Sequence, residues 1–242
     1  MRLKNHVGGV LRRVPPLFRV ASRMARRLDS SFSTLSPGTP EAIHKALQLA
    51  KENASGPGVG DYYEFGLFRG YTFLSAKRAC DDLGLPEVRF YGFDSFAGLP
   101  PVEGVDEGDG QFFAGQFACS RATVEKHLTE NGMDWSRAAL IEGFFDVSLT
   151  EELRTRHPFR PAGVVLLDCD LYSSTADAIR WLEPYLTAGT IILFDDWNSY
   201  GDSADLGQPK AFSEYLERTP HLRAEMLWDF SYHGRAFRLM AS

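Results

Sequence analysis

Short runs of consecutive apolar residues alternate along this chain with longer stretches in which apolar residues recur every three or four positions. The runs within DYYEFG, VRFYGFD, AALIEG, GVVLLD and GTIILF predict five strands, and their continuous apolar character is typical of parallel strands buried on both faces. The stretches with helical spacing predict five helices, over residues 40–53, 72–83, 121–131, 174–185 and 208–217. Because strands and helices alternate, the pattern predicts a doubly wound α/β fold.

Other segments have patterns of their own. RAEMLWDFSYHGRAFRLM predicts two strands joined around His233 and Gly234, as an antiparallel hairpin at an edge of the sheet. The hairpin makes the predicted sheet seven-stranded and mostly parallel. Ser174 and Asp177 have the spacing of a capping box at the start of the fourth helix. The segment 98–115, rich in Gly, Pro and acidic residues, predicts a mobile lid or substrate loop.

The charge is distributed unevenly along the chain. The protein has 242 residues and a net charge of −6, but residues 1–27 contain eight Lys and Arg and no acidic residue. We therefore expect residues 1–39 to form a basic helical extension and residues 40–242 to form a single domain. The extension would pack on the domain or on a second subunit, which leaves a homodimer open, or it would lie on a membrane surface.

Composition narrows the classes of function. The net negative charge argues against general nucleic-acid binding. No apolar run approaches the length of a membrane-spanning helix, so we expect no membrane span. The three cysteines form no CxxC pair, which argues against a disulfide framework or a zinc site and favours the reducing cytoplasm.

The first predicted strand leads into an E-x-G-x-x-x-G motif formed by Glu64, Gly66 and Gly70. Glycines there allow a tight turn into the next helix, whose first N–H groups are free to contact a ligand. The second strand ends at Asp94, where a carboxylate can accept hydrogen bonds from ribose hydroxyls. Each feature alone also fits a simple turn or helix cap. Together they predict a nucleoside-like cofactor. A negatively charged Glu64 suits a cofactor without a pyrophosphate, such as S-adenosylmethionine.

Two acidic pairs, Asp168/Asp170 and Asp195/Asp196, follow the fourth and fifth predicted strands. A right-handed crossover places these strands side by side or one apart, so their carboxylates should converge. Three or four carboxylates in one place repel each other unless a hard cation such as Mg²⁺ lies among them. Either pair alone would also fit a solvated turn with a helix cap. The two pairs beside a cofactor loop predict a magnesium site.

Several motifs resemble those of one enzyme family. EFGLFRG, FDSFAGLP, GDGQF, LIEGFFDVSL, LLDCDLYSST and IILFDDW are similar to segments of the macrocin O-methyltransferase (TylF-like) family, over roughly residues 40–217. The resemblance implies a class I methyltransferase (Rossmann-like) fold. It also implies a methyl transfer from S-adenosylmethionine to a hydroxyl of a sugar or natural-product glycoside, assisted by Mg²⁺.

The resemblance assigns roles to individual residues. The cofactor residues it implies, on the methionine, ribose and adenine parts, are Glu64, Gly66, Gly70, Asp94, Ser95, Phe144 and Asp168. The metal ligands it implies are Asp170, Asp195 and Asp196, with Asp168 as the alternate or fourth carboxylate. Leu171 stands where catechol-type methyltransferases have a lysine base, so an aspartate or metal-assisted deprotonation must substitute. Asp168 or Asp170 is expected to take the proton.

The same motifs also fit other functions. The D-x-D motif also fits a metal-dependent glycosyltransferase or a phosphatase, and the domain could be an inactive methyltransferase-like binding module. The acceptor could be a macrolide sugar, another glycoside or a catechol-like diol. Trp197 could stack on a sugar ring or belong to the core, and His233 fits a turn better than a substrate contact.

Overall fold

The computed structural model describes residues 38–54, 58–107, 111–201 and 203–242. The basic helical extension predicted for residues 1–39 lies almost wholly outside the described residues. Its packing on the domain or on a second subunit of a homodimer therefore stays a prediction. The residues from Pro37 to Ser242 cluster as one unit. The boundary at residue 39 and the assignment of a single domain stay predictions.

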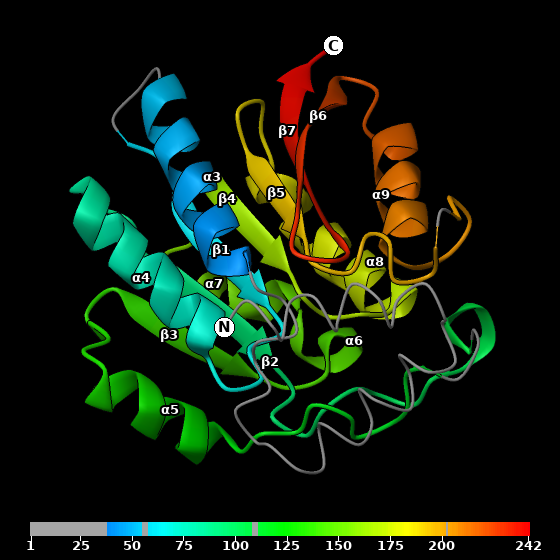
Figure 1. The fold of residues 1–242 in the computed structure, drawn as a ribbon, viewed down its shortest axis with the longest axis horizontal. Helices are drawn as coiled ribbons and strands as arrows, with labels where there is room; N and C mark the ends of the chain where they lie inside the picture. The colour runs from blue at the N-terminus through cyan, green and yellow to red at the C-terminus, as the bar shows by residue number, and fades with distance from the viewer. Residues whose placement is uncertain (1–37, 55–57, 108–110, 202) are drawn as a thin grey trace, which may run out of the picture. The chain divides into compact units, whose positions relative to one another are not determined.

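Seven strands form one sheet (Figure 1). They are β1 (Asp61–Phe65), β2 (Phe90–Asp94), β3 (Ala138–Glu142), β4 (Ala162–Leu167), β5 (Ile191–Phe194), β6 (Leu222–Phe230) and β7 (Gly234–Ala241). Their order in the sheet is β3-β2-β1-β4-β5-β7-β6, with β7 antiparallel to β5 and to β6. The predicted fold, a mostly parallel seven-stranded sheet with a C-terminal antiparallel hairpin, is confirmed.

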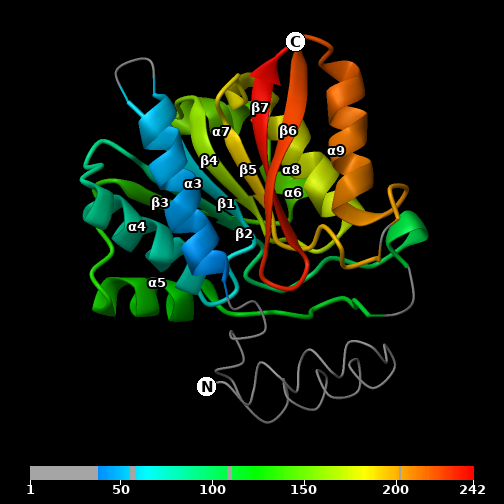
Figure 2. The same ribbon diagram turned by 45° about the horizontal axis from the view of Figure 1, so that its top comes forward.

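Helices cover both faces of the sheet (Figures 1 and 2). They are α3 (Thr39–Asn53), α4 (Tyr71–Leu83), α5 (Arg121–Glu130), α6 (Phe145–Ser148), α7 (Glu151–Arg156), α8 (Tyr172–Leu182) and α9 (Gly207–Arg218). Two 3₁₀ turns, η2 (Gly104–Asp106) and η3 (Glu183–Tyr185), complete the described helical segments. Helices α3, α4 and α5 pack on one face, whereas α7, α8 and α9 pack on the other.

Alternation along β1 explains the two cores. Tyr62 packs with α3 and α4 in the first core, and the next residue, Tyr63, packs with α8 in the second. Both side chains are fully buried. Successive strand residues point to opposite faces, so a strand covered on both faces has no position that faces water. This is why the predicted strands appear as continuous apolar runs.

The predicted capping box at the start of α8 is wrong. The helix begins at Tyr172, and its N-cap residue is Leu171, whose side chain makes no capping hydrogen bond. Instead the carboxylate of Asp106 accepts from the backbone N–H groups of Tyr172 (2.7 Å) and Ser173 (3.1 Å). All five predicted helices and all seven predicted strands are confirmed, with ends that differ by a few residues.

Among the residues that the structure describes, no helix combines the length and the apolar composition that crossing a bilayer requires.

Candidate active site

The two acidic pairs leave the sheet side by side. Strands β4 and β5 are parallel neighbours, with Leu167 opposite Phe194 in the last pair of the ladder. The backbone N–H of Asp195 then donates to the carbonyl of Leu167 at 3.0 Å. The neighbouring strands that the sequence predicts therefore bring the acidic residues to one edge, where open α/β sheets bind ligands.

Three carboxylates converge at this edge. Asp168, Asp195 and Asp196 each offer an oxygen, and these oxygens lie within 4.8 Å of one another. Asp195 and Asp196 are buried, while Asp168 is partly buried. We call these three residues the acidic cluster. The sequence could not separate Asp168 from Asp170 as its third member, and the structure brings in Asp168.

Asp170 lies beside the acidic cluster. Its backbone has a φ of 61°, in the left-handed region, so the chain turns sharply after Cys169. Its N–H donates to Oδ2 of Asp196 at 3.1 Å. Asp168 and Asp170, two residues apart, therefore do not lie on the extended chain that would point both side chains the same way.

The acidic cluster concentrates negative charge. Burial, followed by the charges of Asp195 and Asp196, raises the pKa of Asp168 well above its usual range. Burial, followed by the charges of Asp170 and Asp195, does the same to the pKa of Asp196. Neighbouring carboxylates in a low-dielectric place disfavour each other's ionised form. A cation among them would remove this cost.

Two buried polar side chains outside the acidic motifs contact the cluster. The hydroxyl of Thr39, at the start of α3, donates to Oδ1 of Asp195 at 2.8 Å. The side chain of Gln208, on α9, accepts from the backbone N–H of Asp196 at 3.0 Å and donates to the carbonyl of Leu167 at 3.0 Å. Neither contact was predicted from the sequence, because no local pattern marks a threonine or a glutamine for such a contact.

The loop between β1 and α4 is held by Asp94 at the end of β2. Oδ2 of Asp94 accepts from the N–H groups of Leu67 (2.6 Å) and Phe68 (3.1 Å), and Oδ1 accepts from Phe96 (2.6 Å). An ionised carboxylate has about four acceptor positions. Asp94 therefore shapes the predicted cofactor loop and keeps room for one more donor.

Gly66 brings the two halves of the site together. It has a φ of 90°, and a Cβ built there would lie 1.8 Å from the carbonyl oxygen of Asp168. Any other residue would push the loop away from the acidic cluster. Gly70, with a φ of 75°, instead lies against Val124 and Leu128 of α5. The two glycines of the motif thus serve different contacts.

Glu64 is enclosed by protein. Its carboxylate accepts from the hydroxyls of Tyr62 (2.5 Å) and Thr72 (2.6 Å), and no part of the residue is exposed. Burial raises the pKa of Glu64 to about 8, so the group is mostly neutral at pH 7. The negative charge that the sequence analysis attributed to Glu64 is therefore largely absent in this state, and its contact with the cofactor stays a prediction.

The two residues predicted beside the adenine lie close together along the sheet edge. Ser95 donates its hydroxyl to the carbonyl of Gly98 (2.7 Å) and follows Asp94 directly. The N–H of Gly143 donates to the carbonyl of Asp94 (3.0 Å), which places Phe144 at the start of α6, next to this edge. Their roles toward adenine stay predictions.

The predicted lid segment, residues 98–115, is attached at several points, although its residues 108–110 are outside the described part. Asp106 is buried and binds the first turn of α8 through the two N–H groups described above. Gln111 donates to the carbonyl of Ser199 at 3.1 Å. The segment therefore contacts the chain shortly after each of the two acidic pairs. Its predicted mobility stays a prediction.

Trp197 is partly buried and packs against the core. Its ring lies 4.6 Å from that of Phe237 and 5.0 Å from that of Phe194, measured between centroids. His233 lies in the turn between β6 and β7, where its carbonyl accepts from the N–H of Asn198 at 3.0 Å. The core alternative is the one that the structure supports for Trp197.

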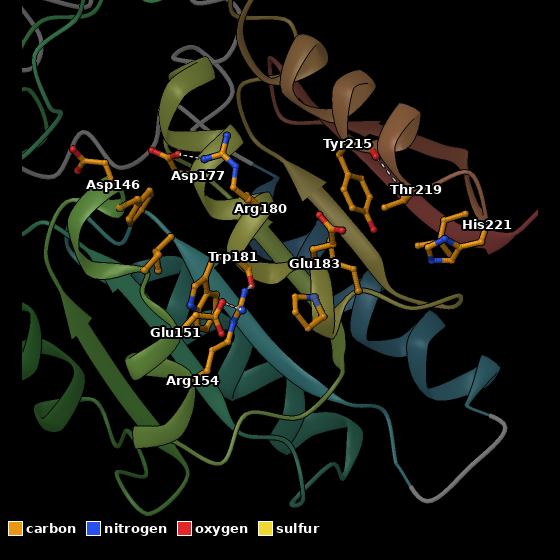
Figure 3. Close-up of a pocket in the computed structure, with 15 residues that line it drawn as sticks. Asp146, Glu151, Arg154, Asp177, Arg180, Trp181, Glu183, Tyr215, Thr219 and His221 are labelled. Atoms are coloured by element: carbon orange, nitrogen blue, oxygen red, sulfur yellow. Dashed lines mark hydrogen bonds and ion pairs between the residues drawn. The ribbon is translucent and has the colours of Figure 1, made fainter.

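Figure 3 shows a pocket that none of the acidic cluster lines. It has a volume of about 600 Å³ and is lined by residues of α6, α7, α8, η3 and α9. Asp177 and Arg180, which form a 2.7 Å ion pair on its wall, come from the second half of α8, whereas Asp168 precedes the first turn of that helix. No predicted site residue lines it, so we do not assign it to the chemistry.

Comparison with known proteins agrees with the motifs. The model of the macrocin-O-methyltransferase (TylF) family matches residues 42–213. The chain belongs to this family. A 4'-O-methyltransferase of Streptomyces olivaceus that acts on 8-demethyl-8-(2,3-dimethoxy-α-L-rhamnosyl)-tetracenomycin C is 30% identical over 161 residues, 62% of this chain and 58% of that protein. The mycinamicin III 3''-O-methyltransferase of Micromonospora griseorubida is 26% identical over 159 residues, 62% of this chain and 61% of that protein.

Solved structures share the fold of this TylF-family chain. The O-methyltransferase NovP has a TM-score of 0.67 at 20% identity, over 84% of this chain and 79% of NovP. The calicheamicin methyltransferase CalS11 has a TM-score of 0.65 at 24% identity, over 82% of this chain and 77% of CalS11. The expected class I methyltransferase fold is confirmed. The alignments with the two curated relatives span about three fifths of each relative's length.

Proposed function

We propose that this protein is an S-adenosylmethionine-dependent O-methyltransferase that acts on a sugar hydroxyl of a small-molecule glycoside, with Mg²⁺ held by the acidic cluster. The observation that carries the proposal is the convergence of Asp168, Asp195 and Asp196 at the edge of a class I methyltransferase sheet. Membership of the TylF family and two relatives that methylate glycosides support the choice of acceptor.

The acidic cluster fits a hard divalent cation. Its three donors are carboxylate oxygens, the ligand type that Mg²⁺ prefers, and their mutual repulsion is the electrostatic condition that a cation relieves. When bound, Mg²⁺ would supply a positive charge that stabilises the acceptor oxygen as it loses its proton. Asp168, Asp195 and Asp196 are the residues that would hold it.

The β1–α4 loop fits S-adenosylmethionine, which would supply the methyl group from its sulfonium. Asp94 keeps one acceptor position, suited to a ribose hydroxyl, because its other positions bind backbone N–H groups of the loop. Gly66 places this loop in contact with the backbone of Asp168. The chain would thereby hold the methyl donor and the acceptor oxygen close and aligned, which is a large part of catalysis for a transfer between two substrates.

The proton of the acceptor hydroxyl needs a base, and Asp170 is the carboxylate that we assign to this role. It lies next to Asp196 but is not one of the three residues whose oxygens converge. Asp170→Asn is therefore expected to lower turnover strongly while the affinity for Mn²⁺, used as a probe for Mg²⁺, changes less than in Asp195→Asn. Equal loss of Mn²⁺ affinity in both variants would instead make Asp170 a ligand.

Family membership favours methyl transfer over the alternatives that the D-x-D motif left open, a glycosyltransferase or a phosphatase. An inactive binding module would have no need to keep three converging carboxylates, since such a cluster is unfavourable without a cation. The cofactor discriminates among these alternatives directly. Calorimetry should show binding of S-adenosylhomocysteine and none of NAD or a nucleotide sugar, and the reverse would overturn the proposal.

The metal assignment is tested by removing one carboxylate. Asp195→Asn should abolish methyl transfer to a rhamnosyl glycoside, measured as released S-adenosylhomocysteine, because a hard cation loses affinity with each charge removed. Binding of S-adenosylhomocysteine should change little, since β1 and β2 carry most of its contacts. Asp177→Asn, on the exposed side of α8 and paired with Arg180, is the matched control. Turnover by Asp195→Asn in EDTA equal to that of the wild type in Mg²⁺ would refute the metal role.

A further inference from the structure

Thr39, near the start of the described residues, contacts Asp195 of the acidic cluster. It is the first residue of α3, is 1% exposed, and donates its hydroxyl to Oδ1 of Asp195 at 2.8 Å across 156 residues of sequence. The preceding N-cap is Gly38, which has no side chain to cap the helix. Helix α3 therefore meets the cluster with its N-terminal, positive end, and the Thr39 hydroxyl makes the hydrogen bond.

Gln208 contacts the cluster from the opposite face of the sheet. Its side chain is fully buried, and its amide bridges the N–H of Asp196 and the carbonyl of Leu167, which are the ends of β5 and β4. Only a side chain that both accepts and donates can make this bridge. The amide orientation is fixed by its partners, because the N–H needs an acceptor and the carbonyl needs a donor.

We propose that Thr39 and Gln208 are positioning residues of the acidic cluster, Thr39 by directing the carboxylate of Asp195 and Gln208 by fixing the backbone of Asp196 against β4. This inference rests on the proposed metal site. A hydrogen bond to one oxygen of a carboxylate limits its rotation about the last bond, so a cation that binds the group has less freedom to remove. Partners of metal ligands typically change metal affinity 10- to 100-fold when removed.

The structure offers a close control for Thr39. Thr190 is also 1% exposed, and its hydroxyl donates to the carbonyl of Ala162 at 2.8 Å. It precedes β5 and bonds the first residue of β4, so it joins the same two strands at the end away from the cluster. Thr39→Val and Thr190→Val remove the same atom from sites of equal burial. A general loss of packing or stability should therefore appear in both.

The experiment measures Mn²⁺ binding to the full-length chain by electron paramagnetic resonance, with melting temperature recorded for each variant. Thr39→Val should bind Mn²⁺ about 10-fold more weakly than the wild type, and Thr39→Ser should restore the affinity because it keeps the hydroxyl. Gln208→Met, which has similar volume and no hydrogen bond, should also lose about 10-fold. Thr190→Val should bind as the wild type does, whatever its melting temperature. Binding of S-adenosylhomocysteine should be unchanged in the Thr39 variants.

The outcomes separate the two proposals. If the wild type and Asp195→Asn bind Mn²⁺ equally or not at all, the metal site is wrong, and the positioning role falls with it. If the wild type binds and Thr39→Val binds equally well, only the role of Thr39 is overturned. The same result for Gln208→Met overturns only that of Gln208. A loss of affinity in Thr190→Val as large as in Thr39→Val would show a general effect of stability and would also overturn the positioning role.

Discussion

Asp106 is the residue whose removal best tests how the segment 98–115 is held against the site. It lies in η2, is 3% exposed, and its carboxylate binds the first two N–H groups of α8, 66 and 67 residues away. Helix α8 begins shortly after Asp168 of the acidic cluster. The side chain of its N-cap residue, Leu171, makes no capping hydrogen bond. Asp106→Ala therefore removes the N-cap of α8 and an anchor of the segment in one change.

The size of the effect follows from these contacts. Loss of an N-cap costs typically about 1 kcal/mol, within about 0.5–2 kcal/mol, and a negative charge at a helix N-terminus adds about 0.3–1 kcal/mol. Tyr172 and Ser173 are partly exposed, so water can replace part of the loss. We expect Asp106→Ala to lower the free energy of unfolding by about 1–2 kcal/mol. Asp106→Asn keeps a capping oxygen without the charge and should lose about half as much.

The assay is denaturant unfolding together with limited proteolysis by chymotrypsin, which can cleave at the exposed Phe113 within the segment. Asp106→Ala should be cleaved there faster than the wild type, with Asp106→Asn between the two. Ser120→Ala is the control, because Ser120 caps α5 through the N–H of Thr123 and is not part of the segment. It should lower stability without changing cleavage at Phe113.

Two results would refute this reasoning about Asp106. If Asp106→Ala unfolds at the same denaturant concentration as the wild type, the carboxylate does not cap α8 in solution. If it is destabilised but cleaved at the wild-type rate, the cap is real, yet the segment is held by other contacts such as that of Gln111 with Ser199. In that case the segment does not depend on α8 for its position.

Three further changes test other parts of the site. Because burial raises the pKa of Glu64 to about 8, the folded state keeps it neutral where the unfolded state ionises it, so stability should fall from about pH 4.5 to about pH 8. Glu64→Gln should reduce the fall in thermal-melt stability over that range in EDTA, while the raised pKa values of Asp168 and Asp196 keep part of it; an unchanged slope would contradict the shift. Asp94→Ala should weaken S-adenosylhomocysteine binding by about 1–3 kcal/mol in calorimetry; unaltered affinity would remove Asp94 from the cofactor site. Gly66→Ala should lower the melting temperature and weaken both S-adenosylhomocysteine and Mn²⁺ binding, because its Cβ would overlap the carbonyl of Asp168; loss of only one would show that the two halves are independent.

The fold was predictable because its elements carry strong local patterns. Strands β1, β2, β4 and β5 are buried on both faces and appear as apolar runs, and α4 ends at Gly84 in the left-handed conformation, as a terminal glycine predicts. Helices α6 and α7 were not predicted, because their four and six residues are too short to show a helical period. The cap of α8 was predicted wrongly, because its partner is remote in sequence.

The candidate site was predictable only where the topology decides it. Parallel strands joined by one crossover must release their acidic pairs at one edge, so the convergence of Asp168, Asp195 and Asp196 follows from the order of the elements. Which of Asp168 and Asp170 joins the cluster depends on one left-handed backbone angle, and no sequence pattern marks that angle. The contacts of Thr39 and Gln208 depend on how α3 and α9 pack, which is tertiary information.

The E-x-G-x-x-x-G motif shows how a cofactor signature can arise from the demands of the protein itself. Glu64 is held by two hydroxyls and is fully buried. Gly70 makes room for α5, and Gly66 makes room for the backbone of Asp168, whose N–H also donates to the carbonyl of Phe65 at 2.9 Å. Each residue therefore has a structural reason that needs no ligand. What the motif offers a cofactor is a loop that lies directly against the backbone of Asp168, because Gly66 has no side chain to hold the two apart.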